Sequence, residues 1–390
     1  MRQRPVLLRI SRLVEHENEM KLAQVKRHWN AFGKRDPFWA ILTHPDKRDG
    51  KWTPEEFFQT GQKTFAEVVA RLESLGIAGK RDHALDFGCG AGRLTRAMAE
   101  HFNDVVGVDI APSMIELARD HNPPANCHFI LNEQSDLRQF ADASFDFIYS
   151  IIVLQHLEPR YSFAYIREFL RVLAPSGVLV FQLPCAQFRF LQDGEKSVAF
   201  AITEPLGDCP AGTEVVVSAI ARNPGPSAWL GAGDASVAPT RVLYSWTPQP
   251  ERSARARDTG ASLPPALGPK KEKPLSLRIR IPHQPGKYIL NLGLEGWSDA
   301  GFAPTGISIV VNGSRLVCAW VSLNRLAAKL HRLGFSHGRK LIGRPVMEMY
   351  GVDQQSVAKC IRDSGGKLIH VERDFWSGPQ WLSYTYYVTR

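Results

Sequence analysis

The stretch Leu85-Asp-Phe-Gly-Cys-Gly-Ala-Gly-Arg93 decides the fold. Its first residues form an apolar strand pattern, its middle is rich in glycine, and a helical pattern follows from Leu94. Gly88, Gly90 and Gly92 lack a Cβ atom, which lets the backbone approach a ligand closely. A strand, a glycine turn and a helix in this order are typical of a nucleotide-binding site in an α/β domain.

Short apolar runs and helical patterns alternate around this turn. A β-α-β-α order predicts parallel strands joined by right-handed crossovers, with helices on both faces of an open twisted sheet. The fold class is therefore α/β, with a Rossmann-like doubly wound sheet. The runs that carry the pattern are 84–87, 94–102, 105–108, 114–118, 128–131, 145–152, 166–173 and 178–183.

The N-terminal region, residues 1–79, is expected to be a helical lid. Thr53, Pro54 and Glu56 form the signature of a capped helix start. Residues 1–19 are basic with a broken apolar pattern, which indicates a frayed extension, an organelle transit peptide being the alternative. Aromatic side chains ahead of the first strand either pack in the core or close over a ligand. They are Trp29, Phe38, Trp39, Phe57 and Phe58.

The pattern changes after residue 195. Eleven of the 26 prolines lie between Pro205 and Pro274. Apolar and polar residues then alternate, which places one face of each strand on a core. The segments 215–220, 241–246, 275–281, 288–294 and 307–311 predict at least five strands and no helix. We therefore expect an antiparallel β-sandwich over residues 196–320, inserted into the α/β domain.

The last segment, residues 321–390, returns to the α/β pattern. Asp353 is a candidate helix cap, and Gly365 is a candidate stop. Strand patterns follow at 367–371 and 383–388. One helix and two strands cannot bury a core alone, so we expect them to complete the sheet whose first part covers residues 80–195.

Composition and charge exclude several classes of protein. The hydrophobic fraction of 44% and charged fraction of 22% are those of an ordinary globular chain. The net charge is +9, yet residues 51–195 carry 13 basic and 19 acidic side chains, which argues against a nucleic-acid groove there. The six cysteines show no metal-ligand spacing or disulfide framework, and no apolar run approaches the ~20 residues of a membrane span. We expect a soluble, cytoplasmic protein without a metal site; its oligomeric state stays open.

Two carboxylates near the glycine turn indicate the ligand. Asp109 ends the second strand, where a carboxylate suits the two hydroxyls of a ribose. Asp86 lies two residues before the first glycine, where a pyrophosphate would rest. An anion there disfavours a dinucleotide, and hence a nicotinamide oxidoreductase, and it favours an ammonium group. The phosphate-free ligand that combines an adenosine ribose with an ammonium group is S-adenosylmethionine.

With these residues the segment resembles the class I S-adenosylmethionine-dependent methyltransferases, of the methyltransferase type 11 or domain 25 kind. The resemblance covers residues 80–184 and, more loosely, 341–390. It implies that Asp86 and the turn hold the methionine part of the cofactor and that Asp109 holds the ribose. It further implies adenine contacts from Ile110, Met114 and the pair Asp136-Leu137. The implied cofactor residues are Asp86, Gly88, Cys89, Gly90, Gly92, Asp109, Ile110, Met114, Asp136 and Leu137.

The same resemblance places the acceptor beside residues 152–156. His156 is the candidate general base, the alternative being a loop histidine bonded to backbone. A strong base is often unnecessary, because the sulfonium is already activated and alignment of the reacting atoms dominates. The predicted activity is in-line methyl transfer to an oxygen, or a nitrogen, of a small molecule or glycan. The alternative is a glycan-binding or scaffolding protein without turnover.

The inserted segment resembles the immunoglobulin-like modules found beside bacterial surface-glycan enzymes. The resemblance rests on Asn223-Pro-Gly225, Trp229, Trp246, Pro285-Gly286 and Tyr288. It implies a sandwich that shapes or extends the acceptor site. Exposed aromatic faces would stack on sugar rings, and the alternative is that these side chains belong to the core.

Overall fold

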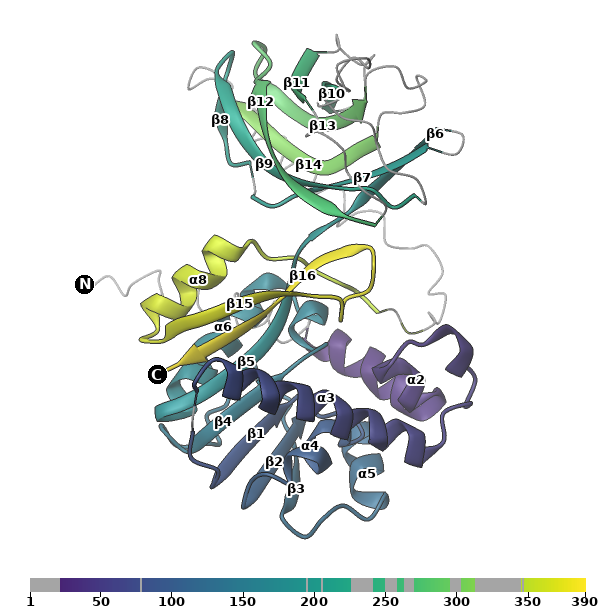
Figure 1. The fold of residues 1–390 in the computed structure, drawn as a ribbon, viewed down its shortest axis with the longest axis vertical. Coiled ribbons are helices and arrows are strands. Elements are labelled where there is room, and N and C mark those ends of the chain that lie inside the picture. The colour runs from purple at the N-terminus through teal and green to yellow at the C-terminus, as the bar shows by residue number, and fades with distance from the viewer. Residues whose placement is uncertain are drawn as a thin grey trace, which may run out of the picture. The chain divides into compact units, whose positions relative to one another are not determined.

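The computed structural model describes two units of the chain (Figure 1). Contacts divide it into unit 1, residues 1–184, 342–378 and 383–390, and unit 2, residues 185–341 and 379–382. The sequence predictions for residues 1–19 and for Trp229 lie outside the described residues. The described residues are 22–77, 79–193, 196–204, 206–225, 241–249, 258–262, 270–294, 303–312, 345 and 347–390.

Unit 1 contains a seven-stranded sheet in the order β15-β16-β5-β4-β1-β2-β3. The pairs β1–β2, β1–β4, β2–β3 and β4–β5 are parallel, and β15–β16 is antiparallel. The parallel Rossmann-like sheet predicted from the sequence is confirmed, and the two C-terminal strands lie at its edge. The strands are β1 (His83–Phe87), β2 (Asp104–Asp109), β3 (Cys127–Leu131), β4 (Phe145–Ser150), β5 (Leu173–Gln187), β15 (Lys367–Asp374) and β16 (Trp381–Thr389).

Helices cover both faces of this sheet. Successive residues of β1 point to opposite faces, so Leu85 joins a cluster with α6 and α8, whereas Ala84 joins one with α3 and α4. The predicted cap of α3 is present: Thr53 Oγ1 accepts from the Glu56 N–H at 3.2 Å, and Pro54 opens the helix. The labelled helices are α2 (Pro37–Ile41), α3 (Pro54–Ser74), α4 (Arg93–Met98), α5 (Pro112–Asp120), α6 (Pro159–Val172) and α8 (Gln354–Asp363), with 3-10 turns η1 (Pro45–Lys47) and η2 (Leu154–His156). A further helix spans 22–35.

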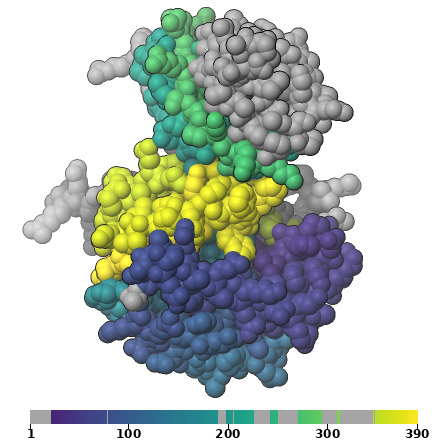
Figure 2. All heavy atoms as spheres, in the orientation of Figure 1, coloured from purple at the N-terminus to yellow at the C-terminus, as the bar shows by residue number. Residues whose placement is uncertain are grey.

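The C-terminal segment packs on unit 1 beside α3. In Figure 2 the yellow C-terminal residues meet the dark blue residues of α3, where Arg71 and Glu372 form an ion pair at 2.5 Å. Asp353 caps α8 by accepting from the Ser356 N–H at 2.8 Å. The ion pair between Arg71 and Glu372 joins segments that lie about three hundred residues apart in the chain.

Unit 2 consists of two sheets whose inward faces share one hydrophobic cluster. The five-stranded sheet has the order β11-β10-β13-β14-β8, and the four-stranded sheet has the order β12-β9-β7-β6. Val217 and Leu277 of the smaller sheet lie in the same cluster as Trp246 and Leu290 of the larger one. Among the described strands of this unit, the paired strands are antiparallel, except for the parallel pair β14–β8.

The sequence patterns missed several strands of this unit. The predicted boundary at 196 falls at the start of β7, and β6 precedes it. The strands are β6 (Arg189–Asp193), β7 (Lys196–Ile202), β8 (Cys209–Pro210), β9 (Glu214–Arg222), β10 (Arg241–Gln249), β11 (Asp258–Ser262), β12 (Glu272–Arg280), β13 (Gly286–Leu294) and β14 (Ala303–Asn312). Across the described residues, no helix combines the length and apolar character of a membrane span, and no group of three metal-ligating side chains occurs.

Candidate active site

The glycine turn lies where β1 ends and α4 begins. The N–H groups of Gly88 and Cys89 both donate to the Val108 carbonyl oxygen, at 2.7 and 3.0 Å, which ties the turn to β2. Gly88 has φ +78°, and a Cβ built there would lie 2.2 Å from Val153 Cγ2. A side chain at this position would therefore collide with the neighbouring loop, in addition to its backbone strain.

Asp109 holds the turn through its carboxylate. Its Oδ2 accepts from the Gly90 N–H at 2.9 Å, and its Oδ1 accepts from the Ala111 N–H at 2.8 Å. Burial raises the pKa of Asp109, and the two backbone donors oppose that shift. Each oxygen keeps a second lone pair, so the carboxylate can still accept from hydroxyl groups of a ligand.

Asp86, near the end of β1, directs its carboxylate toward Thr95 of α4. Its Oδ2 accepts from Thr95 Oγ1 at 2.6 Å, and the residue is 2% exposed. Burial raises the pKa of Asp86 to about 6, although the Thr95 hydroxyl lowers it. Its side chain is absent from the cavity lining described next, because alternate residues of β1 point to opposite faces.

A cavity that is partly open to solvent lies at the carboxyl ends of β1, β2 and β3. Parallel α/β sheets bind ligands at this edge. Of the residues predicted to bind cofactor, the structure brings Gly88, Cys89, Gly90, Asp109, Ile110 and Met114 together here. His156 joins them. The remaining lining residues are Leu22, Val25, Trp29, Ile41, Phe87, Arg93, Leu94, Val108, Asn132, Ile151, Ile152, Val153, Leu157 and Tyr165.

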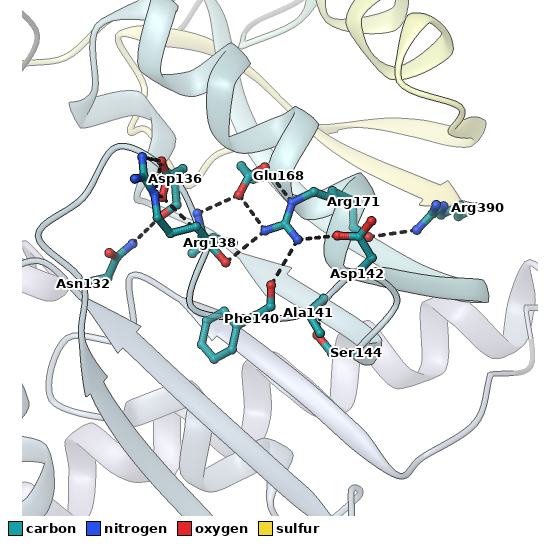
Figure 3. A network of polar contacts seen from close by, with 11 residues as sticks. Asn132, Asp136, Arg138, Phe140, Ala141, Asp142, Ser144, Glu168, Arg171 and Arg390 are labelled. Carbon is teal, nitrogen blue, oxygen red and sulfur yellow. Dashed lines mark hydrogen bonds and ion pairs between the residues drawn. The ribbon is translucent and has the colours of Figure 1, made fainter. Parts of the chain in front are cut away.

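Gly92, Asp136 and Leu137 lie outside this lining. Leu137 is fully buried in the core, and its N–H donates to Glu168 Oε2 at 2.8 Å. Asp136 forms an ion pair with Arg138 at 2.5 Å, and that hydrogen bond lowers the pKa of Asp136. Figure 3 shows Arg171 of α6 beside Glu168 and Asp142. Arg171 Nη2 also donates to the Leu137 carbonyl oxygen at 3.0 Å, which holds this segment against α6.

Asn132 follows β3 directly and lines the cavity, a residue that the sequence analysis did not select. Its N–H donates to the Asp109 carbonyl oxygen at 2.9 Å, and its side-chain Nδ2 donates to the Asp136 carbonyl oxygen at 2.9 Å. Its position directly after the apolar run 128–131 was the available signal, because polar groups at strand ends line such sites.

His156 is buried, with both ring nitrogens engaged. Nδ1 lies 2.7 Å from the Glu348 carbonyl oxygen, so it carries the proton and donates. Nε2 lies 3.1 Å from Gln155 Nε2 and therefore accepts. Burial lowers the pKa of His156 to about 4, so the ring is neutral at pH 7. This geometry favours the backbone-bonded alternative over a free general base.

A buried polar network supports the loop that carries His156. Gln182 Oε1 accepts from the Ile152 N–H at 2.9 Å, and its Nε2 donates to Ser383 Oγ at 2.6 Å and to Ser377 Oγ at 2.8 Å. Ile152 has φ +60°, a conformation that is strained for a β-branched residue. The network therefore holds a strained loop against the cavity.

A second cavity of about 470 Å³ adjoins the first and shares Val25, Trp29 and His156 with it. Trp29 meets the His156 ring edge-on, with centroids 5.1 Å apart. Of the predicted aromatic lid, Trp29 lines both cavities, whereas Phe38 stacks on the buried Phe57 at 4.3 Å. The other residues that line the second cavity are Gln24, His28, Glu158, Tyr161, Glu348 and Tyr350.

Comparison with known proteins places the first cavity in a recognised domain. Residues 85–181 match the family described as "Methyltransferase domain". That segment contains the glycine turn, Asp109, Asn132 and His156. Of the cavity lining, Leu22, Val25, Trp29 and Ile41 lie outside it.

The names of individual relatives describe methyltransferases. The chain is 26% identical over 167 residues to a 2-methyl-6-phytyl-1,4-hydroquinone methyltransferase of Synechocystis sp., covering 42% of this chain and 51% of that protein. It is 31% identical over 169 residues to a ubiquinone biosynthesis O-methyltransferase of Xanthomonas oryzae pv. oryzae, covering 42% and 59%. The chain thus spans between half and three fifths of these relatives. A magnesium protoporphyrin IX methyltransferase from Synechocystis, solved with S-adenosylhomocysteine, aligns at 13% identity and a TM-score of 0.41, covering 95% of this chain and 99% of that one.

Proposed function

We propose that this chain is an S-adenosylmethionine-dependent methyltransferase that acts on an oxygen, or a nitrogen, of a small molecule or glycan. The observation that carries the proposal is the Asp109 carboxylate, which lines the cavity at the glycine turn within the segment that matches methyltransferase domains. S-adenosylmethionine, when bound, supplies an activated methyl group on a sulfonium.

The cavity residues fit such a ligand. Asp109 has lone pairs for ribose hydroxyls, and Ile110, Met114 and Phe87 offer an apolar surface for a base. Asp109 places a carboxylate in the lining beside the turn, which disfavours the approach of a diphosphate.

We propose that the acceptor enters by the second cavity. Trp29 and His156 separate the two cavities, so an acceptor resting there would reach the first cavity past these rings. The neutral His156 orients the loop, and the enzyme contributes mainly alignment of the reacting atoms and exclusion of water.

Unit 2 is proposed to be an immunoglobulin-like sandwich. The shared hydrophobic cluster between its two sheets supports this, and Trp246 and Tyr288 belong to that cluster. Five cysteines within the described residues form no disulfide, which supports the proposed cytoplasmic location.

A methyl-transfer assay tests the proposed function. The purified chain is incubated with labelled S-adenosylmethionine and a panel of phenols, quinols, amines and oligosaccharides, and methylated products are identified by mass spectrometry. We expect a product with the wild type. Asp109→Asn should lower turnover roughly 10- to 100-fold, the equivalent of one lost charge-assisted hydrogen bond. The exposed Asp46→Asn is the control. Cofactor binding without any product would favour a scaffold.

A further inference from the structure

Two glutamine side chains form a chain of hydrogen bonds that ends at His156. Gln182 of β5 and Gln155 of η2 are both buried, and we call this pair the glutamine relay. Gln182 Nε2 lies 3.2 Å from Gln155 Oε1, and Gln155 Nε2 lies 3.1 Å from His156 Nε2. Backbone groups stand at both ends, because Gln182 accepts from the Ile152 N–H and His156 Nδ1 lies 2.7 Å from the Glu348 carbonyl oxygen.

The backbone group at the first end fixes the direction of both amides. The Ile152 N–H can only donate, so the amide oxygen of Gln182 faces it and the NH₂ group of Gln182 faces Gln155. A donor there has to meet the amide oxygen of Gln155, and Ser377 Oγ donates to the same oxygen at 2.7 Å. The NH₂ group of Gln155 is therefore turned toward His156, whose Nε2 has to accept.

The backbone group at the other end leads independently to the same tautomer. The Glu348 carbonyl can only accept, so Nδ1 of His156 carries a proton and donates it. A second proton, on Nε2, would face the NH₂ group of Gln155, and turning that amide over would set it against the NH₂ group of Gln182. Burial also lowers the pKa of His156, and the weaker effect of the Glu348 carbonyl opposes this. The relay therefore admits only the neutral ring.

The charge of this ring matters because His156 lines both cavities. S-adenosylmethionine carries a permanent positive charge on its sulfonium, whereas S-adenosylhomocysteine has a neutral thioether. A protonated His156 would place a second positive charge at the cavity and would repel the sulfonium. The charged side chains among the lining residues are Arg93, Asp109, Glu158 and Glu348, and His28 is the other histidine.

We infer that Gln182 and Gln155 are positioning residues that hold His156 as a neutral ring of one tautomer, so that this wall presents no positive charge to the sulfonium. The inference rests on the proposed function and names the side chains that make the wall compatible with a cationic cofactor. Neither glutamine is among the described residues that line the two cavities, so both act through His156.

Nitrogen NMR of protein labelled with ¹⁵N-histidine tests the relay. The His156 signals are assigned by their loss in His156→Gln. In the wild type at pH 7, Nδ1 should be protonated and Nε2 should not. Gln155→Glu replaces the NH₂ donor by a carboxylate, so His156 should carry a proton on both nitrogens. Gln182→Glu should do the same from a distance, because Gln155 then has to turn its NH₂ group to the new carboxylate and its oxygen to the ring.

Ser383→Ala is the matched control. It removes an acceptor that lies 2.6 Å from Gln182 Nε2, but it reverses no donor in the relay. The neutral tautomer should therefore remain, even where the fold is less stable. A wild-type ring that is protonated on Nε2, or two Glu variants that both leave His156 neutral, would overturn the relay.

Calorimetry at pH 7 tests the consequence for the cofactor. The affinity for S-adenosylmethionine divided by that for S-adenosylhomocysteine should fall about 3- to 10-fold in Gln182→Glu, because a charged ring repels only the sulfonium. Gln155→Glu places its carboxylate beside the ring, so it should lower the ratio less, and it replaces Gln182→Glu should that variant not fold. Ser383→Ala should keep the wild-type ratio.

The two measurements separate the inference from the proposed function. An unchanged ratio in a variant whose His156 is doubly protonated would show that the charge of this ring does not control cofactor binding, and the inference would be wrong. If the wild type binds neither ligand, the proposed function fails, whereas the NMR result still decides whether the relay sets the tautomer of His156.

Discussion

The floor and the wall of the first cavity are built in different ways. The floor is the turn Gly88–Gly92 with Asp109, and its contacts join residues close in sequence, such as the Gly90 N–H and Asp109 Oδ2, 19 residues apart. The wall is Ile152, Val153 and His156 with Trp29, and its supports are distant: His156 bonds to Glu348 across 192 residues.

The floor and the wall therefore have different roles. Backbone groups and glycines build the floor, so it is formed before any ligand arrives. Side chains from several segments build the wall, including a strained Ile152 held by Gln182. We expect floor variants to change cofactor affinity and wall variants to change acceptor turnover.

The largest effect is expected at the floor. Gly88→Ala adds a Cβ 2.2 Å from Val153 Cγ2 at a residue with φ +78°. Overpacking and backbone strain together cost about 3 kcal/mol, so affinity for S-adenosylhomocysteine should fall roughly 100-fold in calorimetry. Gly50→Ala is the matched control, since Gly50 has φ +75° with open space around it. If Gly88→Ala keeps the wild-type affinity, the turn tolerates a side chain and the prediction is wrong.

A moderate effect is expected at the wall. Gln182→Met removes the acceptor of the Ile152 N–H and should destabilise the fold by about 1–3 kcal/mol. Acceptor kcat/KM should fall roughly tenfold, whereas the Kd for S-adenosylhomocysteine should stay within about threefold. The exposed Gln62→Met, which loses only a surface contact to Glu100, is the control. A parallel loss of cofactor affinity would mean that floor and wall are not separate.

The smallest effect on rate is expected at His156. Its folded pKa of about 4 lies below the unfolded value of 6.5, so its stabilising contribution is present above pH 6.5 and is lost as the pH falls toward 4. Between pH 7 and pH 5 the wild type should lose about 2 kcal/mol more stability than His156→Gln, measured by urea unfolding. The kcat profile should show no titration of His156 from about pH 6 to 9. A base with a pKa in that range would refute this assignment.

The features that depend on local contacts, as in the floor of the cavity, could be predicted from the sequence. Local sequence patterns predicted the cap at Thr53, the strand-turn-helix at 85–98 and Asp109. Their hydrogen-bond partners lie at most 19 residues away in the chain. The parallel sheet followed from the alternation of apolar runs, and the structure confirms it.

Other features depend on contacts that local patterns do not contain. The direction of Asp86 toward Thr95 depends on which face of β1 meets α4. The Asp136-Leu137 segment is held by Arg171, a residue more than thirty positions away. The unpaired Nε of Arg93 can be recognised only once α3 is packed against it.

Isothermal titration of the full chain with S-adenosylhomocysteine and with NAD tests the central claim most directly. We expect one site that binds the adenosyl thioether and releases no heat with the dinucleotide. NAD binding, or no binding of S-adenosylhomocysteine at any accessible concentration, would contradict a cavity built for a phosphate-free nucleoside.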